Sequence, residues 1–297
     1  MASPSFSLDI DPERVYTQEE AFSFCEQMTR AHYENFPVGS ILIPRQLRKH
    51  FFSIYAYSRW ADDVADEGSL AVEERIELLD DWERQLHDAY EGRAEHPIFV
   101  ALAATARQRR IPIEPLRDLL KAFRMDARNQ GFETGTDLLF YCHHSANPIG
   151  RLVLHLFGLY TEERRVLSDR LCTGLQLANF WQDVSVDLPR GRINLPRENL
   201  RAFGYTIEEL LDGVYDGRFR EMMAGLVDYA ITQLQQGYPL LVTIPDLRLR
   251  SELALTYLGG TRILRKIVDD DYNIFAHRPV LGLGDKLRML WTLPRHV

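Results

Sequence analysis

Cysteine is scarce in this sequence, with only Cys25, Cys142 and Cys172 among 297 residues. Their spacing matches neither a zinc site nor a disulfide-rich secreted domain, so we expect buried, reduced thiols. Long apolar runs are also missing, and the first residues lack the basic region and apolar core of a secretory signal. These absences predict a cytoplasmic protein that contacts a membrane at most peripherally.

Positive charge is in deficit as well, with 35 Lys and Arg against 43 Asp and Glu and a net charge of −8. Nucleic-acid-binding proteins normally carry a basic surface, so we expect no nucleic-acid partner. No glycine-rich turn follows a predicted strand, which leaves a Rossmann-type nicotinamide site without support. We therefore expect no NADPH cofactor.

Helical periodicity fills most of the chain, without a convincing strand pattern or internal repeat. Hydrophobic residues make up 45% of the sequence, and nothing resembles a linker. We predict one all-α domain over residues 1–297, a helical bundle with a central cavity. Capping boxes mark the helix starts at Thr17 and Thr206. The expected helices cover residues 17–33, 45–67, 71–91, 97–109, 115–130, 136–160, 162–187, 218–242, 248–268 and 283–292, with a further one after Thr206.

Two Asp-x-x-x-Asp motifs, Asp62 with Asp66 and Asp183 with Asp187, are the most informative feature. A step of four residues puts both carboxylates of a pair on one helix face. Mg²⁺ takes one or two carboxylates per site and completes its coordination with waters and substrate phosphates. Two such helices facing each other would therefore bind a diphosphate through two or three Mg²⁺ ions.

Each motif extends into a longer polar stripe along its helix. Tyr55 and Arg59 precede the first motif at helical spacing, while Asp63 turns away from it. Gln176 and Asn179 precede the second, and all four of its polar residues fall within an arc of about 80°. One acidic pair alone is usually a solvated helix face. The aromatic and apolar neighbours of both stripes instead favour a functional pocket.

The segments IYAYSRWADDVAD and LQLANFWQDVSVDLPRGRINLP resemble the two aspartate signatures of the squalene/phytoene synthase family. The resemblance extends over about residues 20–290. This family is α-helical and joins prenyl chains head to head with Mg²⁺. The resemblance implies metal ligands at Asp62, Asp66, Asn179, Asp183 and Asp187.

Other segments of the chain also resemble family blocks. YCHHSANPIG matches the place where a family helix opens near the reacting carbons, and DDDYNIFAHRP matches a block near the end. Gln182 stands where most relatives carry an arginine. The candidate catalytic residues are Tyr55, Arg59, Tyr141, Ser145, Asn147 and Asn194. The implied substrate contacts are His32, Gln176, Gln182, Arg192, Tyr272 and Arg278.

Within the family, NFPVGS, NFWQDVSVD and SANPIGRLVLHL most resemble the bacterial hydroxysqualene synthase branch. This resemblance implies that presqualene diphosphate and water are converted to hydroxysqualene and diphosphate in squalene and hopanoid biosynthesis. Holding that water requires a polar anchor, because a dry apolar cavity would not retain it. Ser145, Asn147 and Asn194 are the candidates. Such side chains equally suit backbone hydrogen bonding at a helix break.

Two alternatives remain open. Condensation of two farnesyl or geranylgeranyl diphosphates to presqualene diphosphate, squalene or phytoene would use the same ligands. The second alternative is a non-catalytic assembly or binding protein on the same fold. A binding role alone would give no reason to keep four carboxylates in a pocket, where charged groups are costly to bury. The expected partners are a prenyl diphosphate substrate and other enzymes of squalene synthesis. The His87-Asp88 pair could suggest a phosphohydrolase, but we interpret it as part of a solvated helix face.

Overall fold

The computed structural model describes residues 14–32 and 43–297, and every regular element in these ranges is a helix. The all-α prediction is therefore confirmed. Contacts divide the chain into two compact units, one of residues 1–129 with 151–160 and one of residues 130–150 with 161–297. The single domain over residues 1–297 stays a prediction. No helix in the described ranges combines the length and apolar character needed to cross a membrane.

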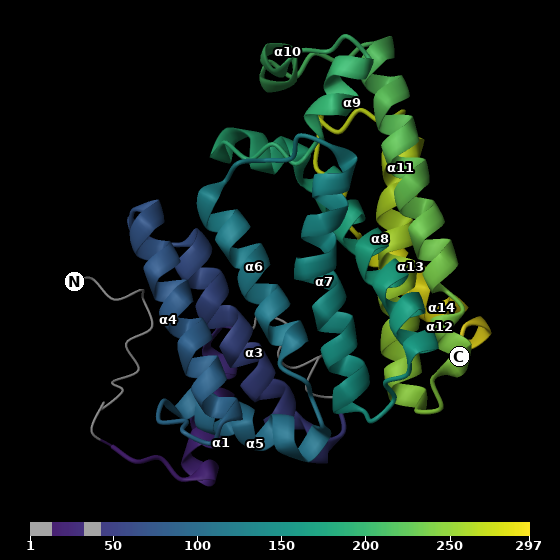
Figure 1. Cartoon of the computed structure of the whole chain (residues 1–297). Coiled ribbons are helices and arrows are strands. Elements are labelled where there is room, and N and C mark those ends of the chain that lie inside the picture. The colour runs from purple at the N-terminus through teal and green to yellow at the C-terminus, as the bar shows by residue number, and fades with distance from the viewer. Residues whose placement is uncertain (1–13, 33–42) are drawn as a thin grey trace. The chain divides into compact units, whose positions relative to one another are not determined.

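The first unit packs around one central helix, α3, which contacts four others (Figure 1). The Thr17 capping box forms as predicted, because Thr17 N donates to Glu20 Oε2 at 2.9 Å and Glu20 N donates to Thr17 Oγ1 at 3.3 Å. The helices are α1 (Gln18–His32), α3 (Arg45–Asp66), α4 (Val72–Tyr90), α5 (Pro97–Arg109), α6 (Glu114–Arg128) and the end of α7 (Gly135–Leu156).

Aromatic side chains fix the orientation of α3 in this unit. Trp60 of α3 stacks on Trp82 of α4 with ring centroids 3.7 Å apart. The buried Tyr57 donates from its hydroxyl to the carbonyl of Leu116 on α6 at 3.0 Å. Because the Tyr57 side chain is buried in the core, the residues on the opposite side of α3 point away from that core.

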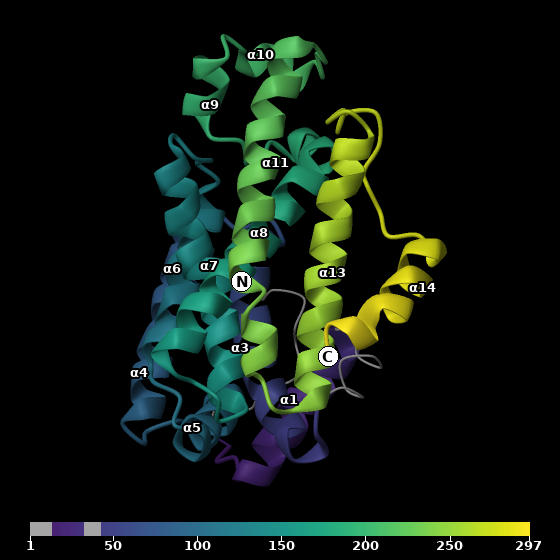
Figure 2. The same cartoon turned by 90° about the vertical axis from the view of Figure 1, so that its right-hand side faces the viewer.

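The second unit is built on three long helices, α8, α11 and α13, which contact one another (Figure 1). Figure 2 shows that α14 follows α13 through an extended connection. The elements after the first part of α7 are α8 (Glu162–Asp187), η1 (Leu188–Arg190), α9 (Arg197–Ala202), α10 (Ile207–Leu211), α11 (Gly217–Gly237), α12 (Leu240–Thr243), α13 (Leu247–Asp269), α14 (Leu283–Thr292) and η2 (Leu293–Arg295).

Two predictions about helix continuity are wrong. The single helix expected over residues 218–242 is two, because α11 ends at Gly237 and α12 begins after Pro239. Pro239 has no backbone N–H, so it cannot donate the next hydrogen bond that would continue α11. The opening that the resemblance implied within YCHHSANPIG is not seen, because α7 continues through Pro148, in agreement with the helix predicted over residues 136–160. Ser145 Oγ donates to the carbonyl of Tyr141 at 2.9 Å, so its backbone bond forms within an unbroken helix.

Close glycine contacts hold α8 against its neighbours. A Cβ placed on Gly237 of α11 would lie 2.5 Å from the backbone nitrogen of Leu171. A Cβ on Gly260 of α13 would lie 2.7 Å from Cδ2 of Leu175. Packed interiors do not accommodate an added methyl group at such distances without backbone or rotamer shifts. Both glycines therefore set how closely α11 and α13 approach α8.

We predict that Gly237→Ala lowers the free energy of unfolding by about 1–3 kcal/mol, because the new methyl group would collide with the backbone of α8. Urea denaturation monitored by circular dichroism measures this change. Gly225→Ala is the matched control on the same helix, since no atom lies within 4 Å of its added Cβ. It should leave stability unchanged or raise it by up to about 1 kcal/mol. Equal stability of the two variants would contradict the packing argument.

Candidate active site

The first aspartate motif lies on the side of α3 turned away from the core of its unit. The Asp62 side chain is 44% exposed and Asp66 is exposed, whereas Tyr57 and Val64 are fully buried. Tyr55 shares this side of the helix at four-residue spacing from Arg59. The predicted stripe is therefore present on α3, with both motif carboxylates accessible.

Arg59 is a shared counter-ion for several carboxylates of α3. Its Nη1 lies 3.2 Å from Asp62 Oδ2, and its Nη2 lies 2.7 Å from Asp63 Oδ1 and 2.9 Å from Glu67 Oε1. Burial raises the pKa of Asp63 to about 7, although Arg59 opposes this shift. Asp63, which we expected to turn away from the stripe, is thus joined to it through Arg59. The predicted contact of Arg59 with a diphosphate stays a prediction.

The second motif is placed at the end of α8, next to the irregular segment that follows. Asn194 donates from Nδ2 to Asp187 Oδ2 at 2.9 Å, and the backbone N–H of Arg192 donates to the carbonyl of Asp187 at 3.0 Å. Burial and the neighbouring charge of Asp183 raise the pKa of Asp187, while Arg192 lowers it. The structure therefore brings Asp183, Asp187, Arg192 and Asn194 together, and their roles in the site stay predictions.

Two hydrogen bonds fasten the chain after α13 onto α8. Arg278 Nε donates to Asp183 Oδ1, and Gln182 Nε2 donates to the carbonyl of Pro279 at 2.6 Å. Gln182 thus positions the segment that carries Arg278. Its predicted direct contact with substrate stays a prediction.

A pocket of about 500 Å³ adjoins this arrangement in the second unit. The part contributed by α13 and α14, including Lys286, was not predicted, because no sequence motif marks it. The paired glycines Gly259 and Gly260 were the available signal, since they permit close approach of a neighbouring chain. The pocket is lined by Leu175, Ala178, Asn179, Gln182, Thr256, Gly259, Gly260, Ile263, Arg278, Val280, Leu281 and Lys286.

Candidate residues on α7 connect to α8 in two ways. The Tyr141 ring lies with its centroid 5.4 Å from that of Phe132 and 5.8 Å from that of Phe180 on α8. Asn147 is buried and accepts through Oδ1 from Thr173 Oγ1 on α8 at 3.0 Å. This hydrogen bond uses one lone pair of the Asn147 amide oxygen. The catalytic roles of Asn147 and Tyr141 stay predictions.

Three predicted features are placed only in part. Tyr272 lies in the turn after α13 with a φ of +64°, a conformation unusual for a non-glycine residue. His32 ends α1, and its side chain lies outside the described residues. The two aspartate motifs belong to different units, so the predicted facing arrangement of α3 and α8 stays a prediction.

The donor set of each motif suits Mg²⁺. In the part of the chain that the structure describes, no three His, Cys, Asp or Glu side chains gather to hold a metal ion by themselves. Mg²⁺ does not require such a cage, because waters and phosphates complete its octahedron. Burial first, and then the neighbouring charge of Asp183, raise the pKa of Asp187, and a bound cation would favour its charged form. The residues present therefore fit the ion.

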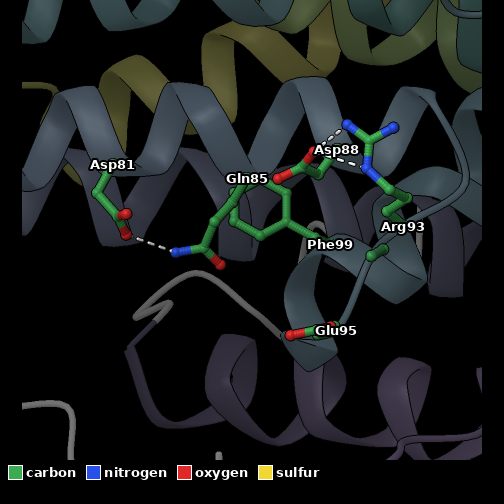
Figure 3. A pocket seen from close by; sticks show the side chains of 7 residues that line it. Asp81, Gln85, Asp88, Arg93, Glu95 and Phe99 are labelled. Atoms are coloured by element: carbon green, nitrogen blue, oxygen red, sulfur yellow. Dashed lines mark hydrogen bonds and ion pairs between the residues drawn. The ribbon is translucent and has the colours of Figure 1, made fainter.

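The first unit has a separate polar pocket, which is lined mainly by charged and amide side chains (Figure 3). Gln85 Nε2 donates to Asp81 Oδ2 at 2.7 Å, and Arg93 Nε donates to Asp88 Oδ1 at 3.1 Å. The side chains of Asp88 and Arg93 are 44% and 61% exposed. Such exposed pairs contribute little to stability and are common on surfaces. The interpretation of Asp88 as part of a solvated helix face agrees with this geometry.

Comparison with known proteins defines the class. The family model for squalene/phytoene synthase matches residues 29–285, so this chain belongs to that family. Members of the family typically use Mg²⁺ with diphosphate substrates. The predicted family and the requirement for prenyl diphosphate substrates are thereby supported at this level.

Individual relatives carry different names. The chain is 36% identical over 232 residues to a hydroxysqualene synthase of Sinorhizobium fredii, covering 78% of each protein. It is 30% identical over 290 residues to a phytoene synthase of Arthrospira platensis, covering 92% of each. Among solved structures, squalene synthase HpnC from Alicyclobacillus acidocaldarius is 41% identical, with a TM-score of 0.81 over 86% of this chain and 96% of that one.

We predict that Asp187→Asn weakens binding of Mg²⁺ with inorganic pyrophosphate by about tenfold or more, because it removes a charged oxygen ligand. Isothermal titration calorimetry on the full chain measures the affinity. Asp228→Asn is the matched control, since Asp228 is exposed on α11 of the same unit. Unchanged affinity in Asp187→Asn would contradict the assignment of this carboxylate to the metal site.

Proposed function

We propose that this chain converts presqualene diphosphate and water to hydroxysqualene and diphosphate with Mg²⁺. The observation that carries the proposal is the bond from Asn194 to Asp187, which keeps a polar amide beside a predicted metal carboxylate. Such a group can hold water close to the departing diphosphate. The likeness to a hydroxysqualene synthase over 78% of the chain supports the same assignment.

Ionisation of the substrate breaks a carbon–oxygen bond and leaves negative charge on diphosphate and positive charge on carbon. Bound Mg²⁺ supplies Lewis-acid stabilisation of the leaving oxygen. The pair Asp183 and Asp187 of the second unit, and the pair Asp62 and Asp66 of the first, would each supply one or two carboxylates to the bound Mg²⁺ ions. Arg278 is anchored to Asp183 through Nε, and its remaining guanidinium N–H groups can donate to phosphate oxygens.

The cation must be shielded until water attacks. Tyr141, placed in an aromatic cluster with Phe132 and Phe180, offers a ring face worth about 0.5–2 kcal/mol to a nearby cation. The water oxygen then forms a bond to carbon, and its proton passes to diphosphate or solvent. Asn194 and Asn147 orient this water in the proposed step.

Condensation is the second candidate, because a phytoene synthase is 30% identical over 92% of the chain. Both reactions begin with loss of diphosphate from a prenyl substrate, so the metal ligands do not separate them. The product does. In the condensing reaction carbon attacks the cation, whereas in the proposed reaction water does.

Purified protein with Mg²⁺ should convert presqualene diphosphate to an alcohol without NADPH, as identified by gas chromatography and mass spectrometry. Farnesyl diphosphate alone should give no product, because the proposed site acts after condensation. Formation of presqualene diphosphate, squalene or phytoene from simple prenyl diphosphates would instead establish the condensing function. No turnover of any of these substrates would favour a binding protein.

We expect Asp62→Ala and Asp183→Ala each to lower turnover by about a thousandfold or more, since each removes a ligand of an ion that stabilises the leaving group. Circular dichroism should show unchanged helical content, because both side chains are partly exposed. Asp80→Ala is the control in the first unit, since the Asp80 side chain is 59% exposed on α4. Wild-type turnover in either motif variant would contradict the proposed metal site.

Water capture predicts a product change in Asn194→Leu and Ser145→Val. Both remove a polar group that can hold water, so the ratio of alcohol to hydrocarbon products should fall by about fivefold or more. Thr136→Val is the control, because Thr136 is exposed on the first turn of the same helix as Ser145. An unchanged alcohol fraction in both variants would remove these residues from the water site.

A further inference from the structure

Helix α14 turns an apolar face to the outside of its unit. Its exposed apolar residues recur at helical spacing and span an arc of about 100°. They are Leu283, Leu287, Leu290 and Trp291, with exposed fractions of 75%, 58%, 57% and 81%. Scattered single apolar residues need no explanation, but four on one face of a short helix form a patch.

The opposite side of α14 is fixed to α13. Asp285 forms two ion pairs with α13. Its Oδ1 lies 2.7 Å from Arg262 Nε, and its Oδ2 lies 3.0 Å from Lys266 Nζ. The Met289 side chain lies near Gly259 of α13, within 3.6 Å of where a Cβ would be. These contacts fix the rotation of α14 about its axis. Its apolar face is therefore held on the outside of the unit.

Positive charge flanks this apolar face on both edges. Lys286 and Arg288 are exposed, and helical geometry places them on either side of the arc. Residues 247–297 contain nine Lys and Arg and five Asp and Glu, although the whole chain carries a net charge of −8. The end of the chain is therefore a basic region on an acidic protein, which indicates an anionic partner surface.

We propose that α14 is an interfacial helix that rests its apolar face on a bilayer containing anionic lipids. Leu and Trp side chains with Lys and Arg at the margins form the pattern that lies in the headgroup region of membranes. A second copy of the chain is the weaker partner, because standard protein interfaces need about 20–30 residues a side. Four apolar side chains are enough to insert shallowly but too few for such an interface.

Docking at α14 has a consequence for the pocket of the same unit. Lys286 of α14 lines that pocket together with Asn179 and Arg278. A lipid-bound α14 would bring the pocket next to the bilayer, where prenyl chains dissolve. This consequence rests on the proposed function, whereas vesicle binding itself does not.

Sedimentation of the full chain with vesicles tests the proposal, using phosphatidylcholine alone or mixed with phosphatidylglycerol. The wild type should pellet with the mixed vesicles and much less with phosphatidylcholine. Leu287→Glu should lower the bound-to-free ratio by about tenfold or more, because a carboxylate replaces an inserting side chain. Arg288→Glu should reduce binding to the anionic vesicles only.

Leu211→Glu is the matched control, because Leu211 is 54% exposed on α10 of the same unit and receives the same substitution. It should bind as the wild type does. Equal binding by Leu287→Glu and the wild type would overturn the proposal, as would failure of the wild type to bind anionic vesicles. A concentration-dependent dimer that Leu287→Glu dissociates, without vesicle binding, would assign the face to a second copy instead. Presqualene diphosphate turnover in detergent, measured on Leu287→Glu, separates failure of docking from failure of the reaction.

Discussion

The packing of α8 is the constraint on which the site of the second unit depends. Gly150, Gly237 and Gly260 come from three different helices, and each meets α8 where an added Cβ would collide. Three backbones can approach one helix this closely only if no side chain intervenes. The rotation of α8 is then fixed, and with it the direction of Asp183 and Asp187 two and three turns further on.

A helix fixed in this way can keep carboxylates in a partly buried position that they would otherwise avoid. Asp187 is destabilised in its charged form by burial and by Asp183, and the Asn194 amide offsets only part of this cost. Arg278 supplies a positive partner to Asp183 from a distant part of the sequence. Repulsion maintained between neighbouring acids is expected where a cation is to bind, which connects the packing of α8 to metal chemistry.

Local sequence signals predicted helices and stripes well but long-range contacts poorly. The ranges 97–109, 162–187 and 283–292 agree with the observed helices, because capping and periodicity are properties of neighbouring residues. Arg59 could be placed beside its aspartates for the same reason. The bond from Gln182 to Pro279 and the position of Lys286 in the pocket depend on α13 lying against α8, which no local pattern encodes. The continuity of α7 through Pro148 also runs against the local expectation for a proline inside a helix.

The segment after α13 contributes both to the pocket of the second unit and to the apolar face of α14. Nothing in the sequence alone indicated that these two features are connected. Arg278 and Pro279 attach it to α8, and eight residues later Lys286 stands between the pocket and the apolar face of α14. Asp285 ties α14 to α13 through two cations, so the helix and the part of the pocket wall on α13 are held to each other. A surface that engages α14 would therefore act on the same wall that carries Arg278. The proposed binding of the diphosphate and the proposed docking of α14 on lipid would thus both depend on one short stretch of polypeptide.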